Sequence, residues 1–344
     1  MIGLLQQLIA IPSLSRDESA VADFLENLLR KEGLNPRRSG NNLWCCYGEG
    51  PAVLLDAHID TVKPVAGWTR DPFTPTLEGG RLYGLGSNDD GASVVAILAA
   101  YKQLIAKPQP YTLILSLSAE EETSGRNGLE ISLAQMEKEC GPIAFGVFGE
   151  PTSLEMAVAE KGLMVLDCSV KGKAGHAARN TGVNAIYEAL PAIEWFRSKQ
   201  FEKVSPLLGP VKMTVTQIQA GTQHNVIPDL CTFVVDTRSN GLYTNEELLK
   251  IIQAEAPCEA QARSTRLCGS SIAEDHPLVL RARQMGLPTV GSPTLSNQAL
   301  CRFPSVKIGP GDSARSHTAD EYVDVADIGK ATEIYVQLLD GLKV

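Results

Sequence analysis

Apolar runs alternate with amphipathic segments along the first 150 residues of the chain. Runs typical of buried strands occupy residues 42–48, 52–58, 111–118 and 143–149. Helical spacing of apolar residues predicts helices over residues 19–33 and 91–106. Ser15 and Glu18 form a capping-box pattern ahead of the first of these helices. Continuous apolar strands interleaved with helices predict an α/β domain, in which helices cover a mostly parallel sheet.

The pattern changes between residues 161 and 263. Residues 164–172 alternate, with Leu166, Cys168 and Val170 on one face and polar residues on the other. A helical pattern at 183–199, alternating strands at 211–219 and 231–239, and a helical pattern at 245–256 follow. This order of half-exposed strands and helices predicts an α+β domain of the ferredoxin-like kind.

After this region, residues 276–286 and 304–311 return to the α/β pattern. We therefore expect residues 1–160 and 264–344 to form one α/β domain, interrupted by an α+β domain at 161–263. A length of 344 residues suits two domains.

Charge and composition exclude several classes of partner. The formal net charge is −9, and no basic block occurs, which argues against nucleic acid as a partner. Residues 1–9 read as an amphipathic helix rather than a signal peptide, and no apolar run reaches the length of a membrane span. The eight cysteines form no CxxC pair, which indicates reduced thiols and a cytoplasmic protein.

Acidic and histidine residues follow the predicted strands repeatedly. They are His58, Asp60, Asp89, the run Glu120–Glu122, Glu150 and His317. A single histidine after a strand is usually structural, and a lone aspartate before a helix is usually an N-cap. In an open α/β sheet, however, ligands bind at the carboxyl ends of the strands. Imidazole and carboxylate groups gathered at one such edge predict a site for zinc-type ions, whose charge would let three adjacent glutamates coexist.

These residues lie in motifs that resemble the M20 family of di-zinc metallopeptidases and deacylases. The motifs are His58-x-Asp60, "GLGSND", "AEEETSG", "GEPT" and "SHTADEY", with "GKAGH" and "GTQHNVIP" in the inserted region. The resemblance covers nearly the whole chain and is strongest to acetylornithine deacetylases and related desuccinylases. It implies that the α/β domain is catalytic and binds zinc, and that the inserted domain is a dimerisation lid.

The resemblance also implies roles for the residues of the metal site. His58 and Glu150 would bind one ion, Glu122 and His317 the other, and Asp89 would bridge both. The ions would be two zinc ions, with cobalt as the alternative. Asp60 would orient His58 and raise its basicity. Glu121 would be the general base that takes a proton from a water shared by the two ions, and Glu120 would be less critical.

Further residues are implied in substrate binding. His176 would stabilise the oxyanion in the active site of a partner subunit, which implies a homodimer. Asn225 and Arg238 would contact the substrate. For Arg238 the partner would be a carboxylate, which the guanidinium group can bind through two hydrogen bonds. Lys161 and Arg315 are additional basic candidates. Thr294 and Ser296 would line a pocket loop within residues 292–300.

The chain departs from the family pattern at two places. Relatives usually carry D-x-K-G after the bridging aspartate, whereas this chain reads Asp89-Asp90-Gly91-Ala92. Asn297 stands where many relatives have aspartate. The family also has a cis peptide after the bridging residue, so we expect one between Asp89 and Asp90.

The resemblance predicts an amidohydrolase that removes the acyl group from an N-acyl amino acid. The leading substrate is N-acetylornithine, or N-acetylcitrulline, in arginine biosynthesis. The alternatives are a desuccinylase of succinyl-ornithine or succinyl-diaminopimelate, and a dipeptidase. A catalytically silent binding relative is a further alternative, which the complete set of metal ligands and the presence of Glu121 disfavour.

Overall fold

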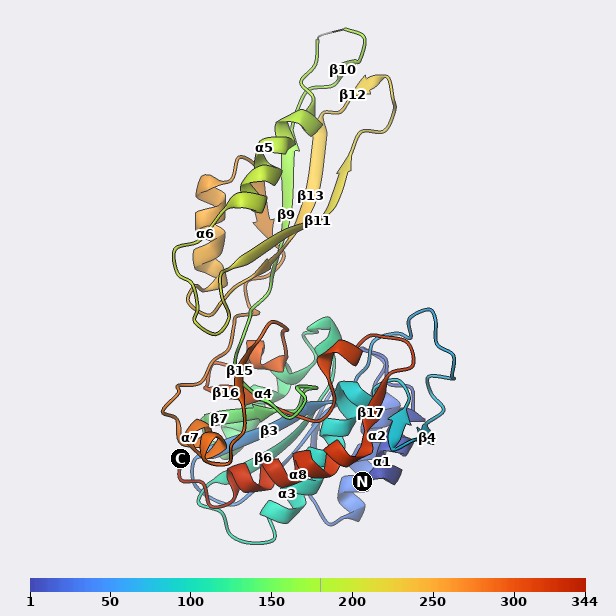
Figure 1. The fold of residues 1–344 in the computed structure, drawn as a ribbon, viewed down its shortest axis with the longest axis vertical. Helices are drawn as coiled ribbons and strands as arrows, with labels where there is room; N and C mark the ends of the chain where they lie inside the picture. Colours follow the sequence, from blue (N-terminus) through green and yellow to red (C-terminus); the bar gives the residue numbers. More distant parts are fainter. Residues whose placement is uncertain (180) are drawn as a thin grey trace. The chain divides into compact units, whose positions relative to one another are not determined.

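The chain folds into two compact units, shown in Figure 1. The computed structural model describes residues 1–179 and 181–344. The first unit comprises Met1–Val158, Ser271–Val290 and Ser296–Val344, and the second comprises Ala159–Ser270 and Gly291–Leu295.

The sequence pattern predicts residues 159–160, 264–270 and 291–295 in the α/β domain, whereas all three segments belong to the second unit. Hydrogen bonds explain the assignment. The side-chain amide of Asn245 donates to the carbonyl of Leu267 (2.8 Å), and the backbone N–H of Lys161 donates to the carbonyl of Ser292 (3.1 Å).

An eight-stranded sheet forms the centre of the first unit. Its strands are, in spatial order, β1 (Arg37–Ser39), β2 (Asn42–Tyr47), β6 (Thr112–Ser118), β3 (Ala52–His58), β7 (Ile143–Phe148), β16 (Ser305–Lys307), β8 (Met156–Glu160) and β15 (Thr289–Ser292). Strands β6, β3, β7 and β16 are parallel, whereas β2 and β8 pair antiparallel with their neighbours β6 and β16. The prediction of a mostly parallel sheet is confirmed.

Helices cover both faces of this sheet. Helices α1 (Ile2–Ile9), α2 (Ser19–Lys31), α3 (Ala92–Leu104), α7 (Pro277–Gln284) and α8 (Val325–Leu339) share one core with Val53 and Leu55 of β3. Helix α4 (Leu129–Cys140) packs with Leu54 on the opposite face. Strand β3 is buried along its whole length, which explains why it is apolar rather than alternating.

The predicted capping box at Ser15 and Glu18 is wrong. Glu18 is itself the residue before α2 and makes no side-chain cap hydrogen bond. The hydroxyl of Ser15 donates instead to the carboxylate of Asp60 (2.6 Å), and the carboxylate of Glu18 accepts from the backbone N–H of Glu120 (3.3 Å). Both side chains are therefore used at the carboxyl edge of the sheet and not at the helix end.

Short elements complete the first unit. A small sheet is formed by β17 (Tyr322–Asp324), β5 (Arg81–Tyr83) and β4 (Thr76–Glu78), in that order. Four single helical turns lie in loops: η1 (Ser87–Gly91), η2 (Glu121–Thr123), η3 (Asn297–Leu300) and η4 (Ser313–Arg315). Turns η1 and η2 contain residues of the motifs "GLGSND" and "AEEETSG", and turns η3 and η4 contain Asn297 and Arg315.

The second unit is an antiparallel sheet covered by two helices. Its strands, in spatial order, are β11 (Lys212–Ala220), β13 (Leu230–Arg238), β9 (Met164–Lys171) and β14 (Glu259–Ala262). Helices α5 (Ala185–Ser198) and α6 (Asn245–Glu255) supply Phe196 and Ile252 to a core that also contains Leu166 and Phe233. A two-stranded ribbon joins β10 (Gly175–His176) to β12 (Val226–Ile227). The chain order and sheet order match the predicted ferredoxin-like fold.

None of the helices within residues 1–179 and 181–344 has the length and apolar character that crossing a membrane requires.

Candidate metal centre

The parallel strands bring the predicted site residues to one edge of the sheet. His58 ends β3 directly opposite Ser118, the last residue of β6, and the glutamate run follows Ser118. Phe148 at the end of β7 lies opposite Asp56, and Glu150 comes two residues later. Segments separated by up to about 90 residues therefore deliver their side chains to the same edge.

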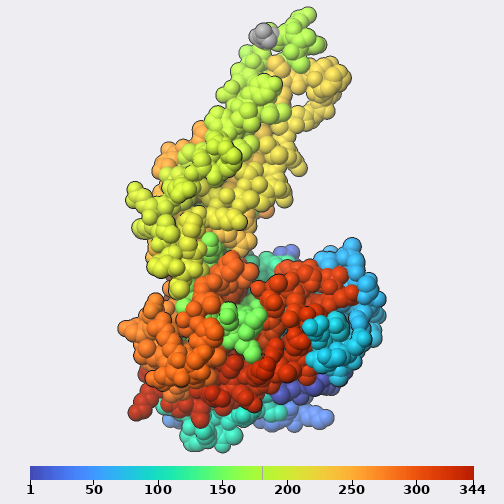
Figure 2. Space-filling view, viewed as in Figure 1, coloured from blue at the N-terminus to red at the C-terminus, as the bar shows by residue number. Residues whose placement is uncertain are grey.

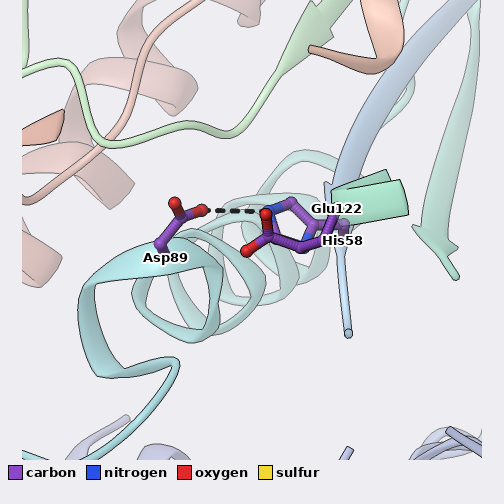
Figure 3. A group of neighbouring side chains, drawn as sticks. All are labelled: His58, Asp89 and Glu122. Carbon is purple, nitrogen blue, oxygen red and sulfur yellow. Dashed lines mark hydrogen bonds and ion pairs between the residues drawn. The ribbon is translucent and has the colours of Figure 1, made fainter. Parts of the chain in front are cut away.

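The imidazole of His58 is buried and fixed on both sides. The ring Nδ1 lies 2.9 Å from the backbone carbonyl oxygen of Asp60, and Nε2 lies 3.0 Å from Oδ1 of Asp89 (Figure 3). Because a carbonyl oxygen only accepts, Nδ1 carries the proton of that bond, and Nε2 is the atom directed toward the carboxylates. This is the orientation that a metal-binding histidine needs.

Asp89 lies on the turn η1, and the peptide bond between Asp89 and Asp90 is cis, as expected from sequence. Its two carboxylate oxygens face different histidines. Oδ1 is 3.0 Å from Nε2 of His58, and Oδ2 is 3.8 Å from Nε2 of His317. A carboxylate placed between two imidazoles has the geometry of a bridging ligand.

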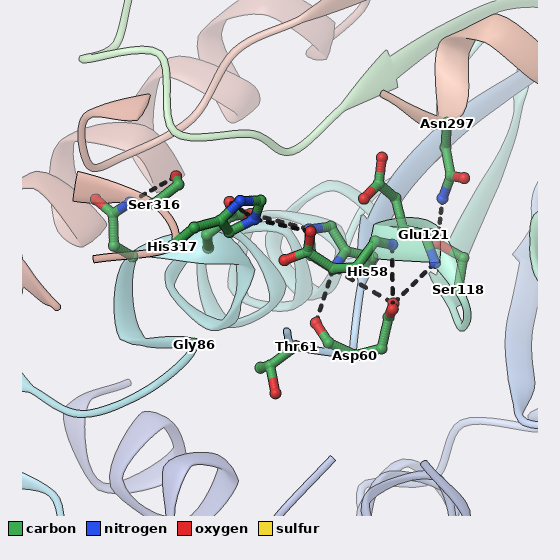
Figure 4. A network of polar contacts seen from close by, with 12 residues as sticks. His58, Asp60, Thr61, Gly86, Ser118, Glu121, Asn297, Ser316 and His317 are labelled. Carbon is green, nitrogen blue, oxygen red and sulfur yellow. Dashed lines mark hydrogen bonds and ion pairs between the residues drawn. The ribbon is translucent and has the colours of Figure 1, made fainter. Parts of the chain in front are cut away.

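Asp60 fixes the main chain of the glutamate run. Its carboxylate accepts from the backbone N–H of Glu121 (3.0 Å) and of Glu122 (3.2 Å), and it also accepts from Ser15. Figure 4 shows this network around Asp60 and His58. Asp60 therefore holds both the imidazole and the turn that carries the two glutamates.

The three adjacent glutamates have different surroundings. The carboxylate of Glu120 accepts from the backbone N–H (3.3 Å) and the side-chain amide (3.0 Å) of Asn127, within its own loop. Oε2 of Glu122 lies 2.8 Å from Nε2 of His317. Oε1 of Glu122 is buried and has no hydrogen-bond partner among the described residues. A buried carboxylate oxygen in this state is suited to a cation.

His58, Asp89 and Glu122 form a candidate metal site, because one ligand atom from each lies within 4.8 Å of the others. His317 adjoins this group through its contacts with Glu122 and Asp89. Burial is the main cause of the raised pKa of Glu150, and the negative charges of Glu121 and Asp89 add to it, which indicates that Glu150 lies near this group. Imidazole nitrogens with carboxylate oxygens are the ligand set of zinc-type ions.

The electrostatics of the site show a deficit of positive charge. Burial, together with neighbouring carboxylates, raises the pKa of Glu121, Glu122 and Glu150. Burial opposes the charged form of His58, but hydrogen bonds to Asp60 and Asp89 raise its pKa well above the usual value. The hydrogen bond to Glu122 raises the pKa of His317 to about 9. These raised pKa values favour the protonated forms when no cation is bound, and binding of divalent cations at such groups displaces protons.

The remaining candidates of the first unit have structural partners. Arg315 forms an ion pair with Asp324 (3.1 Å) and stacks on Tyr322, with its guanidinium 4.2 Å from the ring centroid. The hydroxyl of Ser296 caps η3. Asn297 donates to the hydroxyl of Ser118 (2.9 Å) in the buried layer beneath the site.

The other candidates belong to the second unit. The ammonium group of Lys161 donates to the carbonyl of Pro210 (3.2 Å), and Arg238 pairs with Asp236 (2.8 Å). Asn225 accepts a backbone hydrogen bond in the ribbon that carries His176. The hydroxyl of Thr294 lies 3.0 Å from that of Ser292.

Sequence reasoning missed buried residues that support the site. Glu321 is 2% exposed and accepts hydrogen bonds from the backbone of the loop that carries Asp89. Lys307 in β16 is also buried, and its positive charge opposes the rise in the pKa of Glu150 that burial causes. Glu321 lies within the motif "SHTADEY", so the sequence could have marked it as a candidate residue. The sequence could not show its contact with the loop about 230 residues earlier in the chain.

Comparisons with known proteins agree with this geometry. The family model described as Peptidase family M20/M25/M40 matches residues 54–341. The chain is 28% identical to an acetylornithine deacetylase of Proteus mirabilis, with 99% of this chain and 96% of the relative covered. It is 26% identical to a succinyl-diaminopimelate desuccinylase of Delftia acidovorans, with 99% and 98% covered.

A solved structure shares the fold. It is a dinuclear metal binding peptidase from the M20 family of Bacillus subtilis, with a TM-score of 0.75, 16% identity, and 99% of this chain and 98% of that chain covered. The family match spans most of both α/β segments and the inserted region. The chain therefore belongs to peptidase family M20/M25/M40, and it is a hydrolase that acts on amide bonds.

Proposed function

We propose that this protein is a metal-dependent deacylase of N-acyl amino acids, with N-acetylornithine or N-acetylcitrulline as its substrate in arginine biosynthesis. The observation that carries the deacylase proposal is the position of Asp89, whose two oxygens face His58 and His317 beside Glu121 and Glu122. The acetyl group and the pathway rest on similarity to a relative named acetylornithine deacetylase.

The proposed metal ligands divide into two sets that share Asp89. His58 and Glu150 would hold one ion, and Glu122 and His317 the other. When bound, two divalent ions, zinc or alternatively cobalt, supply an activated water nucleophile and polarise the scissile carbonyl. Two features fit this ion type: Oε1 of Glu122 has no hydrogen-bond partner within residues 1–179 and 181–344, and the donors combine imidazole and carboxylate groups.

Glu121 is the proposed general base. Its main chain is fixed by the hydrogen bond from its N–H to Asp60 (3.0 Å), and burial among other carboxylates raises its pKa. A raised pKa brings a carboxyl group closer to the working pH, where it can accept a proton and return it to the leaving amine. His176 would donate a hydrogen bond to the oxyanion from a partner subunit.

Desuccinylation is the second candidate, because a desuccinylase of similar identity covers the same length of chain. A succinyl group requires a cation to meet its second carboxylate. Arg315 is a poor candidate since Asp324 and Tyr322 already occupy its guanidinium. Lys161 is the remaining basic candidate: burial, together with the nearby positive charges of Lys212 and Arg238, lowers its pKa, and a substrate carboxylate would offset that repulsion. Dipeptide hydrolysis is a third possibility within the same mechanism.

We also propose a cytoplasmic homodimer assembled through the second unit. Helix α5, yellow-green in Figure 2, exposes Ile186 (38%), Tyr187 (68%) and Leu190 (56%). The edge strand β11 exposes Ile218 (54%). Apolar side chains on an outer helix and an unpaired edge strand favour association with a second copy. All eight cysteines are free thiols, which supports the cytoplasmic location.

The test is a hydrolysis assay of zinc-loaded protein on N-acetylornithine and N-succinylornithine, side by side. Preference for the acetyl substrate supports the deacetylase. Preference for the succinyl substrate supports the desuccinylase, and Lys161→Met should then reduce the preference while Lys203→Met should not. If protein with two bound zinc ions hydrolyses neither of these compounds, the assay is extended to N-acetylcitrulline, succinyl-diaminopimelate and dipeptides. No hydrolysis of any of them would refute the deacylase proposal.

A further inference from the structure

One buried carboxylate holds the loop that presents Asp89. Oε1 of Glu321 accepts from the backbone N–H of Asn88 (2.9 Å) and of Asp89 (3.0 Å), and Oε2 accepts from the N–H of Gly86 (3.2 Å). The side chain of Glu321 is 2% exposed. Three N–H groups of one short turn therefore converge on a single side chain that lies far away in sequence.

The turn needs this acceptor because it has irregular backbone geometry. Gly86 has φ +73°, and η1 contains non-helical dihedral angles at Asp89 and Asp90. Buried N–H groups outside regular structure require a partner. Successive N–H groups in a turn of this kind form a concavity for an acceptor group, and the two side-chain oxygens of Glu321 fill that role.

Glu321 is itself fixed by the small sheet. Its backbone carbonyl accepts from the N–H of Gly84 (3.0 Å), and the next residue, Tyr322, pairs with Tyr83 of β5. The side chain of Asn88 adds a second link. Its amide donates to the hydroxyl of Ser316 (3.3 Å), and Ser316 is the residue before His317. The segment that carries His317 and the loop that carries Asp89 are thus held to each other.

A role in packing alone does not explain a glutamate at this position. A further negative group beside Asp89 adds repulsion to a cluster already rich in carboxylates. An apolar residue would fill the space without that repulsion, but it would leave three N–H groups without their acceptor. The chain instead retains a carboxylate whose bonds end on the amide of Asp89 itself.

We infer that Glu321 is a positioning residue for the bridging carboxylate of Asp89 and, through it, for the two metal ions. This inference rests on the proposed dinuclear site. Glu321 touches no reacting atom, so its effect should be on metal binding before any effect on chemistry. Loss of a residue that orients a ligand typically weakens metal affinity by about 10- to 100-fold.

The test compares Glu321→Gln and Glu321→Ala with Glu333→Gln, an exposed glutamate on α8 that serves as the charge control. Glutamine retains the volume and one oxygen for Asn88 and Asp89, but turns an NH2 group toward the N–H of Gly86. Zinc affinity is measured by competition with a chromophoric chelator, and Co²⁺-loaded protein gives the absorption spectrum of the site. The unfolding temperature of metal-free protein is recorded separately.

We expect Glu321→Gln to bind zinc about 10- to 100-fold more weakly than wild type, with an altered cobalt spectrum, whereas Glu333→Gln matches wild type. Unchanged affinity and spectrum in Glu321→Gln would overturn the inference, even if metal-free stability falls. If the alanine variant does not fold, the glutamine variant decides. A wild-type protein that binds fewer than two ions would refute the dinuclear site itself, which is a separate failure.

Discussion

The run Glu120–Glu122 allows one substitution, glutamate to glutamine, to be made at three adjacent positions with three different expected results. Glu121→Gln keeps the volume of the side chain and the backbone bond to Asp60, so metal content should not change. It removes the proposed base, which should lower kcat by about 10² to 10⁴-fold. At about 1.36 kcal/mol per factor of ten, this is a loss of about 3 to 5 kcal/mol of transition-state stabilisation.

The same change at the neighbouring positions should act elsewhere. Glu122→Gln removes a proposed ligand and the charge of the contact with His317 (2.8 Å), so the protein should lose metal as well as activity. Glu120→Gln disturbs only the two bonds to Asn127. It should cost about 1 to 3 kcal/mol of stability and leave activity within a few-fold of wild type.

The assay combines kcat, zinc per chain and unfolding temperature for the three variants, with Glu333→Gln as the control. The metal-free form of Glu121→Gln should unfold at a temperature equal to or above that of wild type, because burial and neighbouring carboxylates raise the pKa of Glu121 and the neutral amide relieves repulsion. Activity retained in Glu121→Gln would refute its assignment as the base. A loss of zinc in the same variant would show that Glu121, and not Glu122, is the ligand.

Three further predictions follow from the site and the second unit. The pKa of His317 is raised to about 9, and a metal ion binds only the neutral ring, so zinc binding at pH 7 should release protons. Zinc affinity should therefore rise with pH up to about 9. Calorimetry in buffers of different ionisation enthalpy measures the number of protons released on binding. Binding that is independent of pH and releases no protons would contradict this prediction. Asp60→Asn should weaken zinc binding by about 10- to 100-fold, measured by chelator competition, because Asp60 orients His58; unchanged affinity would contradict that role. Leu190→Glu should convert a dimer into a monomer in sedimentation experiments, with Leu280→Glu as an exposed control on α7; a wild-type monomer at micromolar concentration would contradict the proposed assembly.

Periodicity predicted the elements that carry most of the site. Strands β3, β6 and β7 are rich in apolar residues because they are buried on both faces, so their ends could be placed within a residue or so. Strand β14 was not predicted, since its sequence "EAQA" has little preference for a strand and pairs only because β9 offers an edge. Tertiary context decided this case.

Long-range contacts of polar side chains could not be read from the sequence. Ser15 and Glu18 fit a local capping pattern, yet both have partners at the sheet edge instead. The hydroxyl of Ser15 donates to Asp60, and the carboxylate of Glu18 accepts from the backbone N–H of Glu120. The sequence marks Arg315 as an additional basic candidate, and it shows neither of the partners, Asp324 and Tyr322, that engage the guanidinium in the structure. A sequence pattern reports local options, and the fold selects among them.

The most direct test of the dinuclear deacylase is a titration of metal-free protein with zinc, followed by hydrolysis of N-acetylornithine and N-succinylornithine at each step. The account predicts no activity without metal, and activity on at least one substrate that saturates at two zinc ions per chain. Full activity in the presence of a strong chelator, or saturation of the metal site with no hydrolysis of any acyl amino acid, would contradict it.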